Sequence, residues 1–197
     1  MERRRFLTVA IGGPVTGVLA ARAAVAQARG LAATPACGGV TPRQTPGPFF
    51  KPSSPRRLSL REPGLAGTPL VLTGRVVSTE CEPIGGALLD FWQADDAGTY
   101  DNAGFRLRGH QQADQEGRYR LETIVPGLYP GRTRHVHLNV QAPDRGVLTT
   151  QLYFPWEAQN RRDGIFDPAL VVRVDGDRSA PVATFDFVLN SPGRRRS

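Results

Sequence analysis

The chain has 197 residues and a formal net charge of +7, and its length suits one domain and a leader. Residues 1–28 contain four arginines and one glutamate, which is +3, and the arginines at 194–196 add another +3, so the body of the chain is close to +1. Because that body has no basic stripe, we exclude nucleic acid as a partner.

The first 28 residues are predicted to be an export signal, because a basic start precedes a mildly apolar stretch that ends in small residues at 24–26. The arginines at 3–5, followed by Phe6 and Leu7, resemble a twin-arginine signal, and an ordinary arginine-rich signal is the alternative. The apolar stretch is broken at residues 12–14 and is short for a membrane span. We therefore expect a periplasmic or extracellular protein with no span in its mature chain, and a leader kept as an uncleaved anchor is the alternative.

Residues 29–69 are rich in proline, glycine and arginine, with TPRQTPGPFFKP at their centre. Repeated prolines remove backbone donors, so we expect an extended N-terminal arm laid over the domain. Cys37 in this arm and Cys81 are the only cysteines. An even pair in an exported protein predicts a disulfide between the arm and the first hairpin, and two free thiols are the alternative.

Residues 70–190 are predicted to form one all-β domain, a sandwich or a barrel. Seven short strand-like runs alternate with turn signals; they are PLVLTGRVVS, ALLDFWQ, RYRLETI, RHVHLNVQ, LTTQLYF, ALVVRV and ATFDFVL. The polar stretch 95–117 is expected to be a long loop, and the basic tail 191–197 is expected to be flexible.

The run RHVHLNV carries two of the three histidines, His135 and His137. On a strand both imidazoles share one face, while Val136, Leu138 and Val140 line the other. A zinc site would need a third ligand, for which His110 is available. A facial-triad iron site would need a nearby carboxylate, and the nearest one upstream of the histidine pair is Glu122.

Two of the four tyrosines lie in turn-like segments, Tyr100 in WQADDAGTY and Tyr129 in PGLYPGR. Tyr119 and Tyr153 instead occupy alternating strand positions that are typical of packing residues. A phenolate is a hard anionic oxygen donor that a trivalent iron stabilises far below its usual pKa. Two tyrosines and two histidines would leave Fe(III) with a net charge of +1 and with room for substrate.

Four segments, TPRQTPGPFF, WQADDAGTY, FRLRGHQQADQEGRYRLETIVPGLYPGRTRHVHLNV and TQLYFP, resemble the intradiol ring-cleavage dioxygenases, especially their exported single-chain branch. This resemblance implies a β-sandwich related to transthyretin-like domains and a non-haem Fe(III) centre. It implies that Tyr100 is a permanent iron ligand, that Tyr129 is a ligand released by substrate, and that His135 and His137 complete the set.

The resemblance also assigns catalytic roles to Arg132, which would stabilise developing negative charge, and to Gln151, which lies near that arginine. The implied reaction inserts both atoms of O2 into a catechol-type ring and yields a muconate-type dicarboxylate. Arg134 departs from the small residue or proline usual in relatives, so we expect it at the strand edge or beside a partner. We assign no role to three charges interpreted as solvated, Glu157, Asp163 and Asp167.

Two other functions compete with this interpretation. A secreted β-sandwich binding module without enzymatic activity would have no iron, and a zinc hydrolase would use His110, His135 and His137. The ring substituent stays open among catechol, hydroxyquinol, protocatechuate and larger aromatics. The oligomeric state is equally open, with a homo-oligomer among the alternatives.

Overall fold

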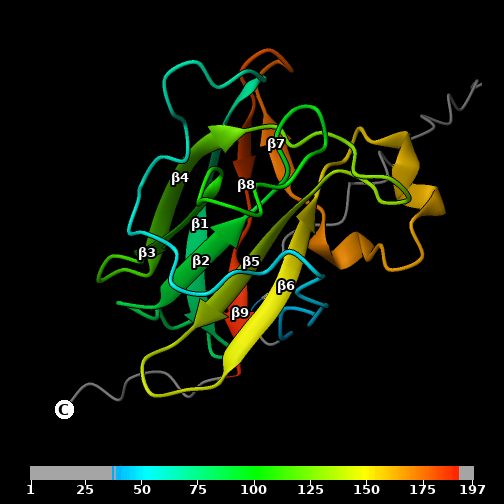
Figure 1. The fold of residues 1–197 in the computed structure, drawn as a ribbon. Coiled ribbons are helices and arrows are strands. Elements are labelled where there is room, and N and C mark those ends of the chain that lie inside the picture. Colours follow the sequence, from blue (N-terminus) through cyan, green and yellow to red (C-terminus); the bar gives the residue numbers. More distant parts are fainter. Residues whose placement is uncertain (1–36, 38, 191–197) are drawn as a thin grey trace, which may run out of the picture.

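The computed structural model describes residues 37 and 39–190 and shows two β-sheets (Figure 1). The strands are β1 (Pro69–Ser78), β2 (Leu88–Trp92), β3 (Arg108–Gln112), β4 (Arg118–Ile124), β5 (His135–Gln141), β6 (Val147–Tyr153), β7 (Arg173–Asp175), β8 (Val182–Thr184) and β9 (Phe187–Leu189). One sheet has the order β4-β1-β8-β7, with β9 also paired to β1, and the other has the order β3-β2-β5-β6. The predicted leader and basic tail lie outside the described residues.

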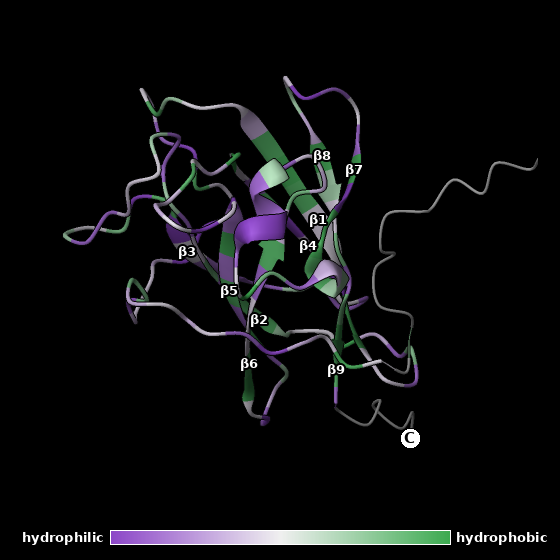
Figure 2. Ribbon diagram, turned by 90° about the vertical axis from the view of Figure 1, so that its right-hand side faces the viewer, coloured by the Kyte–Doolittle hydropathy of each residue, from purple (hydrophilic) through white to green (hydrophobic). Residues whose placement is uncertain are grey.

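The two sheets share one apolar core, which confirms the all-β sandwich. Alternation along the strands decides which residues enter that core: in β4, Tyr119 and Leu121 are buried while Arg118 and Arg120 are exposed. Figure 2 shows the hydrophobic residues concentrated along the strands and the hydrophilic ones in the loops around them. The described residues contain no α-helix, only the short 3-10 helices η1 (Ala158–Arg162) and η2 (Pro168–Leu170).

The structure corrects three boundaries predicted from the sequence. The stretch 95–117, predicted to be a loop, contains the edge strand β3. Its sequence RGHQQ is polar, yet it forms a strand because backbone hydrogen bonds to β2 hold it. An edge strand does not need two apolar faces. The run ALVVRV divides into η2 and β7, where Asp167 caps the short helix. The run ATFDFVL divides into β8 and β9 at Asp186, whose carboxylate accepts a hydrogen bond from the Arg75 amide at 2.8 Å.

Residues 39–68 form no named helix or strand, and between residues 44 and 57 this arm crosses the four-stranded sheet from one edge to the other (Figure 1). At the β6 edge, the Gln44 amide donates to the Thr149 carbonyl at 2.8 Å. At the β3 edge, the Arg57 amide donates to the His110 carbonyl at 2.9 Å. The arm therefore covers the sheet face that points away from the core.

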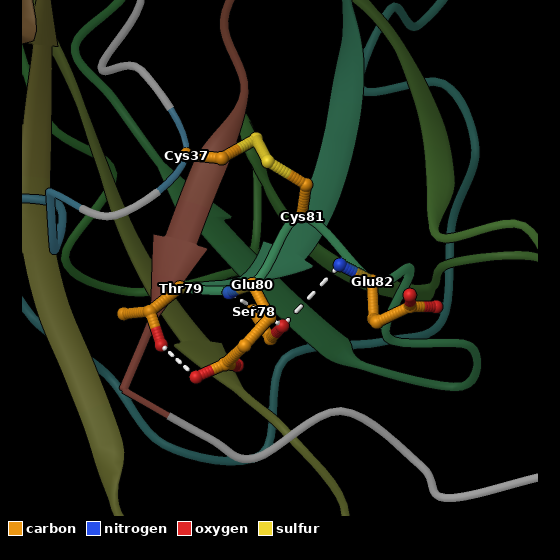
Figure 3. The surroundings of a disulfide bond; sticks show 6 residues. All are labelled: Cys37, Ser78, Thr79, Glu80, Cys81 and Glu82. Atoms are coloured by element: carbon orange, nitrogen blue, oxygen red, sulfur yellow. Dashed lines mark hydrogen bonds between the residues drawn. A yellow bond between two sulfur atoms is a disulfide. The ribbon is translucent and has the colours of Figure 1, made fainter.

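The predicted disulfide is confirmed, with Cys37 and Cys81 joined and their Cα atoms 5.1 Å apart (Figure 3). Cys81 lies in the turn after β1, where the Ser78 hydroxyl accepts hydrogen bonds from the amides of Glu80 and Glu82. The disulfide thus ties the start of the arm to the end of the central strand. No helix in residues 37 and 39–190 is long and apolar enough to cross a membrane.

Candidate metal centre

The outer face of the four-stranded sheet carries the histidine pair. The register aligns a row of four residues across the sheet, Arg108, Trp92, His137 and Gln151. His135 lies two residues before His137 on the same face of the sheet, opposite Tyr153. As alternation predicted, Val136, Leu138 and Val140 point the other way and are buried in the core.

Two ring nitrogens and one phenol oxygen meet under the arm. His135 Nε2 lies 3.0 Å from His137 Nε2 and 3.2 Å from the Tyr100 hydroxyl. The two imidazoles and the phenol expose only 4%, 2% and 6% of their surfaces. His135 Nδ1 lies 2.6 Å from the Thr133 carbonyl, which can only accept, so Nδ1 carries the proton. The lone pair of His135 Nε2 therefore points at the other two groups.

Burial keeps this cluster neutral in the metal-free protein. The pKa of His135 is lowered from 6.5 to about 4, mainly by loss of solvation and also by Arg132, which together outweigh the opposing effect of the hydrogen bond to Thr133. Burial also holds the pKa of His137 well below its usual range, with His135 and Arg132 acting in the same direction. Burial raises the pKa of Tyr100, which the nearby Arg132 only partly offsets. A bound cation would reverse the effect on the tyrosine and favour its phenolate form.

Tyr129 joins this cluster through its ring. It is half-buried in the loop between β4 and β5, and its ring packs edge-on against Tyr100 with centroids 5.9 Å apart. Phe49 of the arm contacts both rings, stacked on Tyr100 at 4.4 Å and edge-on to Tyr129 at 5.3 Å. The structure therefore brings together all four residues predicted to bind the metal.

Arg132 and Gln151, the two predicted catalytic residues outside the ligand set, contact one another. Arg132 Nη2 donates to Gln151 Oε1 at 2.7 Å, and Gln151 Nε2 donates to the Thr45 carbonyl of the arm at 2.9 Å. Arg132 Nε donates to Asp163 at 2.8 Å. Asp163 is only 7% exposed, so our interpretation of this residue as a solvated charge is wrong.

Glu157 and Arg134 form a second ion pair at 2.7 Å. Arg134 Nη1 also donates to the Pro126 carbonyl at 2.7 Å, which gives this residue the partner expected from its position before β5. Glu157 caps η1 as well, and Asp167 caps η2, so neither is simply solvated. These contacts hold the loops on either side of the histidine pair.

Sequence reasoning missed three residues at this site. Trp92 stacks on His137, with centroids 5.1 Å apart and planes 3° from parallel. Arg108 is 2% exposed and donates to the Phe49 carbonyl at 2.6 Å, which holds the arm above the cluster. Gly47 of the arm lies so close that a Cβ there would meet His137 Cε1 at 3.3 Å. Only the sequence TPGPFF, in which proline and glycine force a turn, hinted at the close approach of Gly47.

His110 lies on the same sheet face but is engaged elsewhere. Its Nδ1 is 2.7 Å from the Ser54 carbonyl, and it pairs across the sheet with Asp90. Across residues 37 and 39–190, no group of three or more His, Cys, Asp or Glu side chains is arranged to hold a metal. The geometry therefore does not support the three-histidine zinc alternative, and a metal at this site would require tyrosine oxygens.

The residues present fit a trivalent iron. Two neutral imidazole nitrogens and the Tyr100 oxygen converge, and Tyr129 lies beside them. His137 Nδ1 is buried and makes no hydrogen bond to any described residue, and the Trp92 ring stacks on this imidazole. Two phenolates and two imidazoles give the hard, anionic ligand set that suits a highly charged cation.

Comparisons with known proteins agree with this geometry. The profile of a family described as "Dioxygenase" matches residues 47–191. Among solved structures, the dioxygenase domain of a dioxygenase carbohydrate-binding protein fusion from Streptomyces sp. SirexAA-E is 54% identical, with a TM-score of 0.75, over 77% of this chain and 99% of that one. The 3-chlorocatechol 1,2-dioxygenase of Rhodococcus opacus 1CP is 27% identical, with a TM-score of 0.70, over 75% of this chain and 71% of that one.

Two characterised relatives match more narrowly. The protocatechuate 3,4-dioxygenase beta chain of Burkholderia cepacia is 35% identical over 51% of this chain and 50% of its own length. The hydroxyquinol 1,2-dioxygenase of Nocardioides simplex is 30% identical over 66% of this chain and 52% of its own length. The match thus spans about half the length of these two relatives. The chain belongs to the intradiol ring-cleavage dioxygenase family, and its β-sandwich is the fold of that family.

Proposed function

We propose that this protein is a non-haem Fe(III) dioxygenase that cleaves a catechol-type ring with O2 to a muconate-type dicarboxylate. One observation carries the proposal: three buried groups converge, namely His135 Nε2, His137 Nε2 and the Tyr100 hydroxyl. Together with Tyr129, these groups would hold the metal. When bound, Fe(III) would supply Lewis acidity toward both catechol oxygens and withdraw charge from the ring.

The two tyrosines would have different roles because their surroundings differ. Tyr100 is 6% exposed and stacked under Phe49, so it has little room to move. Tyr129 is half-buried on a loop, and its side chain can move away without breaking the sheet. We assign Tyr129 Oη as the base that accepts a proton from the incoming catechol.

Arg132 would stabilise the negative charge that develops on the substrate ring. Its Nε and Nη2 are held by Asp163 and Gln151, so the guanidinium is fixed before substrate arrives. Its field reaches the cluster, since it lowers the pKa of both Tyr100 and His137. The aromatic rings over the site exclude water, which strengthens such an interaction, and losing one contact of this kind typically costs about 10²–10³ in rate.

Metal analysis and a visible spectrum of the purified mature protein, before and after anaerobic addition of catechol, test the proposal. We expect one iron per chain and a broad tyrosinate-to-iron band that moves when catechol binds. His137→Gln should abolish the band, whereas His110→Gln, a matched change on the same sheet face, should preserve it. A colourless wild-type protein that takes up no iron on reconstitution would instead support the secreted binding module.

Export and the identity of the substrate are further parts of the proposal. The Cys37–Cys81 disulfide supports an oxidising compartment such as the periplasm or the exterior. Amino-terminal sequencing of the protein recovered from that compartment would show whether residues 1–28 are removed. Relatives named for catechol, hydroxyquinol and protocatechuate all match this chain, so turnover of each of the three should be measured in parallel.

A further inference from the structure

The buried carboxylate that holds Arg132 also contacts the Thr133 peptide, which leads to the first histidine of the candidate metal centre. The side chain of Asp163, just after η1, is 1% exposed. Its Oδ2 accepts hydrogen bonds from Arg132 Nε at 2.8 Å and from the Thr133 amide at 2.9 Å. Its Oδ1 accepts a hydrogen bond from the Ile165 amide at 3.1 Å. Three donors therefore converge on one carboxylate.

The first consequence concerns the cation of the site. The Arg132 side chain is 20% exposed and could adopt many rotamers if it were unpaired. Asp163 holds Nε, and Gln151 holds Nη2. An arginine held at two nitrogens by charge-assisted hydrogen bonds keeps its plane and its position. Asp163 therefore determines where the positive charge lies.

The second consequence concerns the first histidine. The Thr133 amide donates to Asp163, while the Thr133 carbonyl accepts from His135 Nδ1 at 2.6 Å. One residue thus links the carboxylate to the imidazole. A partner behind a ligating histidine determines its tautomer and the direction of its free nitrogen. His137 has no such partner among the described residues, so the support from Asp163 acts on His135 alone.

The charge of Asp163 is maintained in the fold. Burial by itself would raise the pKa of this carboxyl, but the amides of Thr133 and Ile165 together with the Arg132 guanidinium outweigh burial and hold the pKa below its usual value. The group therefore stays an acceptor for all three donors at neutral pH. It does not touch the converging nitrogens and oxygen itself. It reaches them through its contacts with Arg132 and Thr133, and its charge also raises the pKa of His135 against the effect of burial.

We propose that Asp163 is the positioning residue of this centre, acting on Arg132 through its side chain and on His135 through the Thr133 peptide. Only the expected effect on turnover rests on the proposed function. The placement of Arg132 and His135 can be measured without turnover. A carboxylate that merely anchored the loop would leave the iron affinity and the state of the Arg132 side chain unchanged once the variant had folded.

The test compares Asp163→Asn with Asp167→Asn, which changes a carboxylate in the same loop whose capping role an amide can keep. In the metal-free protein, the Arg132 Nε–H resonance, assigned with Arg132→Lys, should exchange slowly with solvent in the wild type and rapidly in Asp163→Asn. Fe(III) affinity, measured by competition with a chelator, should fall about 10–100-fold in Asp163→Asn. The catechol kcat should fall within the same range while KM changes by less than about threefold. Asp167→Asn should match the wild type in every measurement.

A folded Asp163→Asn variant with wild-type iron affinity and a slowly exchanging Arg132 Nε–H would overturn the proposal. If Asp163→Asn does not fold, the wild-type resonance still decides, because rapid exchange of that proton in the wild type would show that the carboxylate does not hold it. If the wild type does not turn over catechol at all, while the affinity and exchange results are as expected, the proposed reaction is refuted and the positioning role stands.

Discussion

Acid should destabilise the metal-free protein through its buried histidine pair. The folded pKa of His135 is about 4, against 6.5 for an exposed histidine, because burial disfavours the imidazolium. Between these values the unfolded chain binds a proton that the folded chain does not, so stability is fully present above pH 6.5 and is lost as the pH falls toward 4. One pKa unit corresponds to about 1.4 kcal/mol, so the loss from this residue is about 3 kcal/mol. His137 contributes in the same direction.

Urea unfolding at a series of pH values from 7 to 4 measures this loss. The carboxylates of the protein also titrate in that range, so the informative quantity is the difference between wild type and His135→Gln. The wild type should lose about 3 kcal/mol more than the variant over this interval. Equal losses in the two proteins would mean that His135 is not buried as a neutral group, and the reasoning would be wrong.

Three further predictions concern the arm, the disulfide and the second tyrosine. Gly47→Ala should weaken Fe(III) binding in a chelator competition, because its Cβ would press on the imidazole of His137. Gly64 also has a positive φ but lies in open space, so Gly64→Ala should lower stability only. Reduction of the Cys37–Cys81 bond, which closes a separation of 44 residues, should lower the free energy of unfolding in urea by about 4 kcal/mol; no change with reductant would contradict this. Tyr129→Phe should retain iron but shift the visible band and alter catechol binding, and an unchanged spectrum would remove this residue from the ligand set.

Local sequence determined which side chains share a face. The alternation in HVHLNV placed both imidazoles on one side and the valines and leucine in the core, because successive side chains of a strand point in opposite directions. The short alternating runs also predicted an all-β domain, and the even cysteine pair of an exported chain predicted the disulfide between Cys37 and Cys81. Local sequence failed for β3, whose polar residues carry no alternation that would distinguish a strand from a loop.

Apart from the family resemblance, only the tertiary structure decided which side chains contact the histidine pair and Arg132. Tyr100 reaches His135 across 35 positions of the chain, and Arg132 meets Asp163 across 31, through loops whose closure no local pattern specifies. Asp163 was therefore misread as solvated, although it is buried and bonded to Arg132 and Thr133, which lie 31 and 30 positions away in the chain. Gly47 approaches His137 because the arm is pinned at both edges of the sheet, and such long-range backbone contacts leave no periodic signal in the sequence.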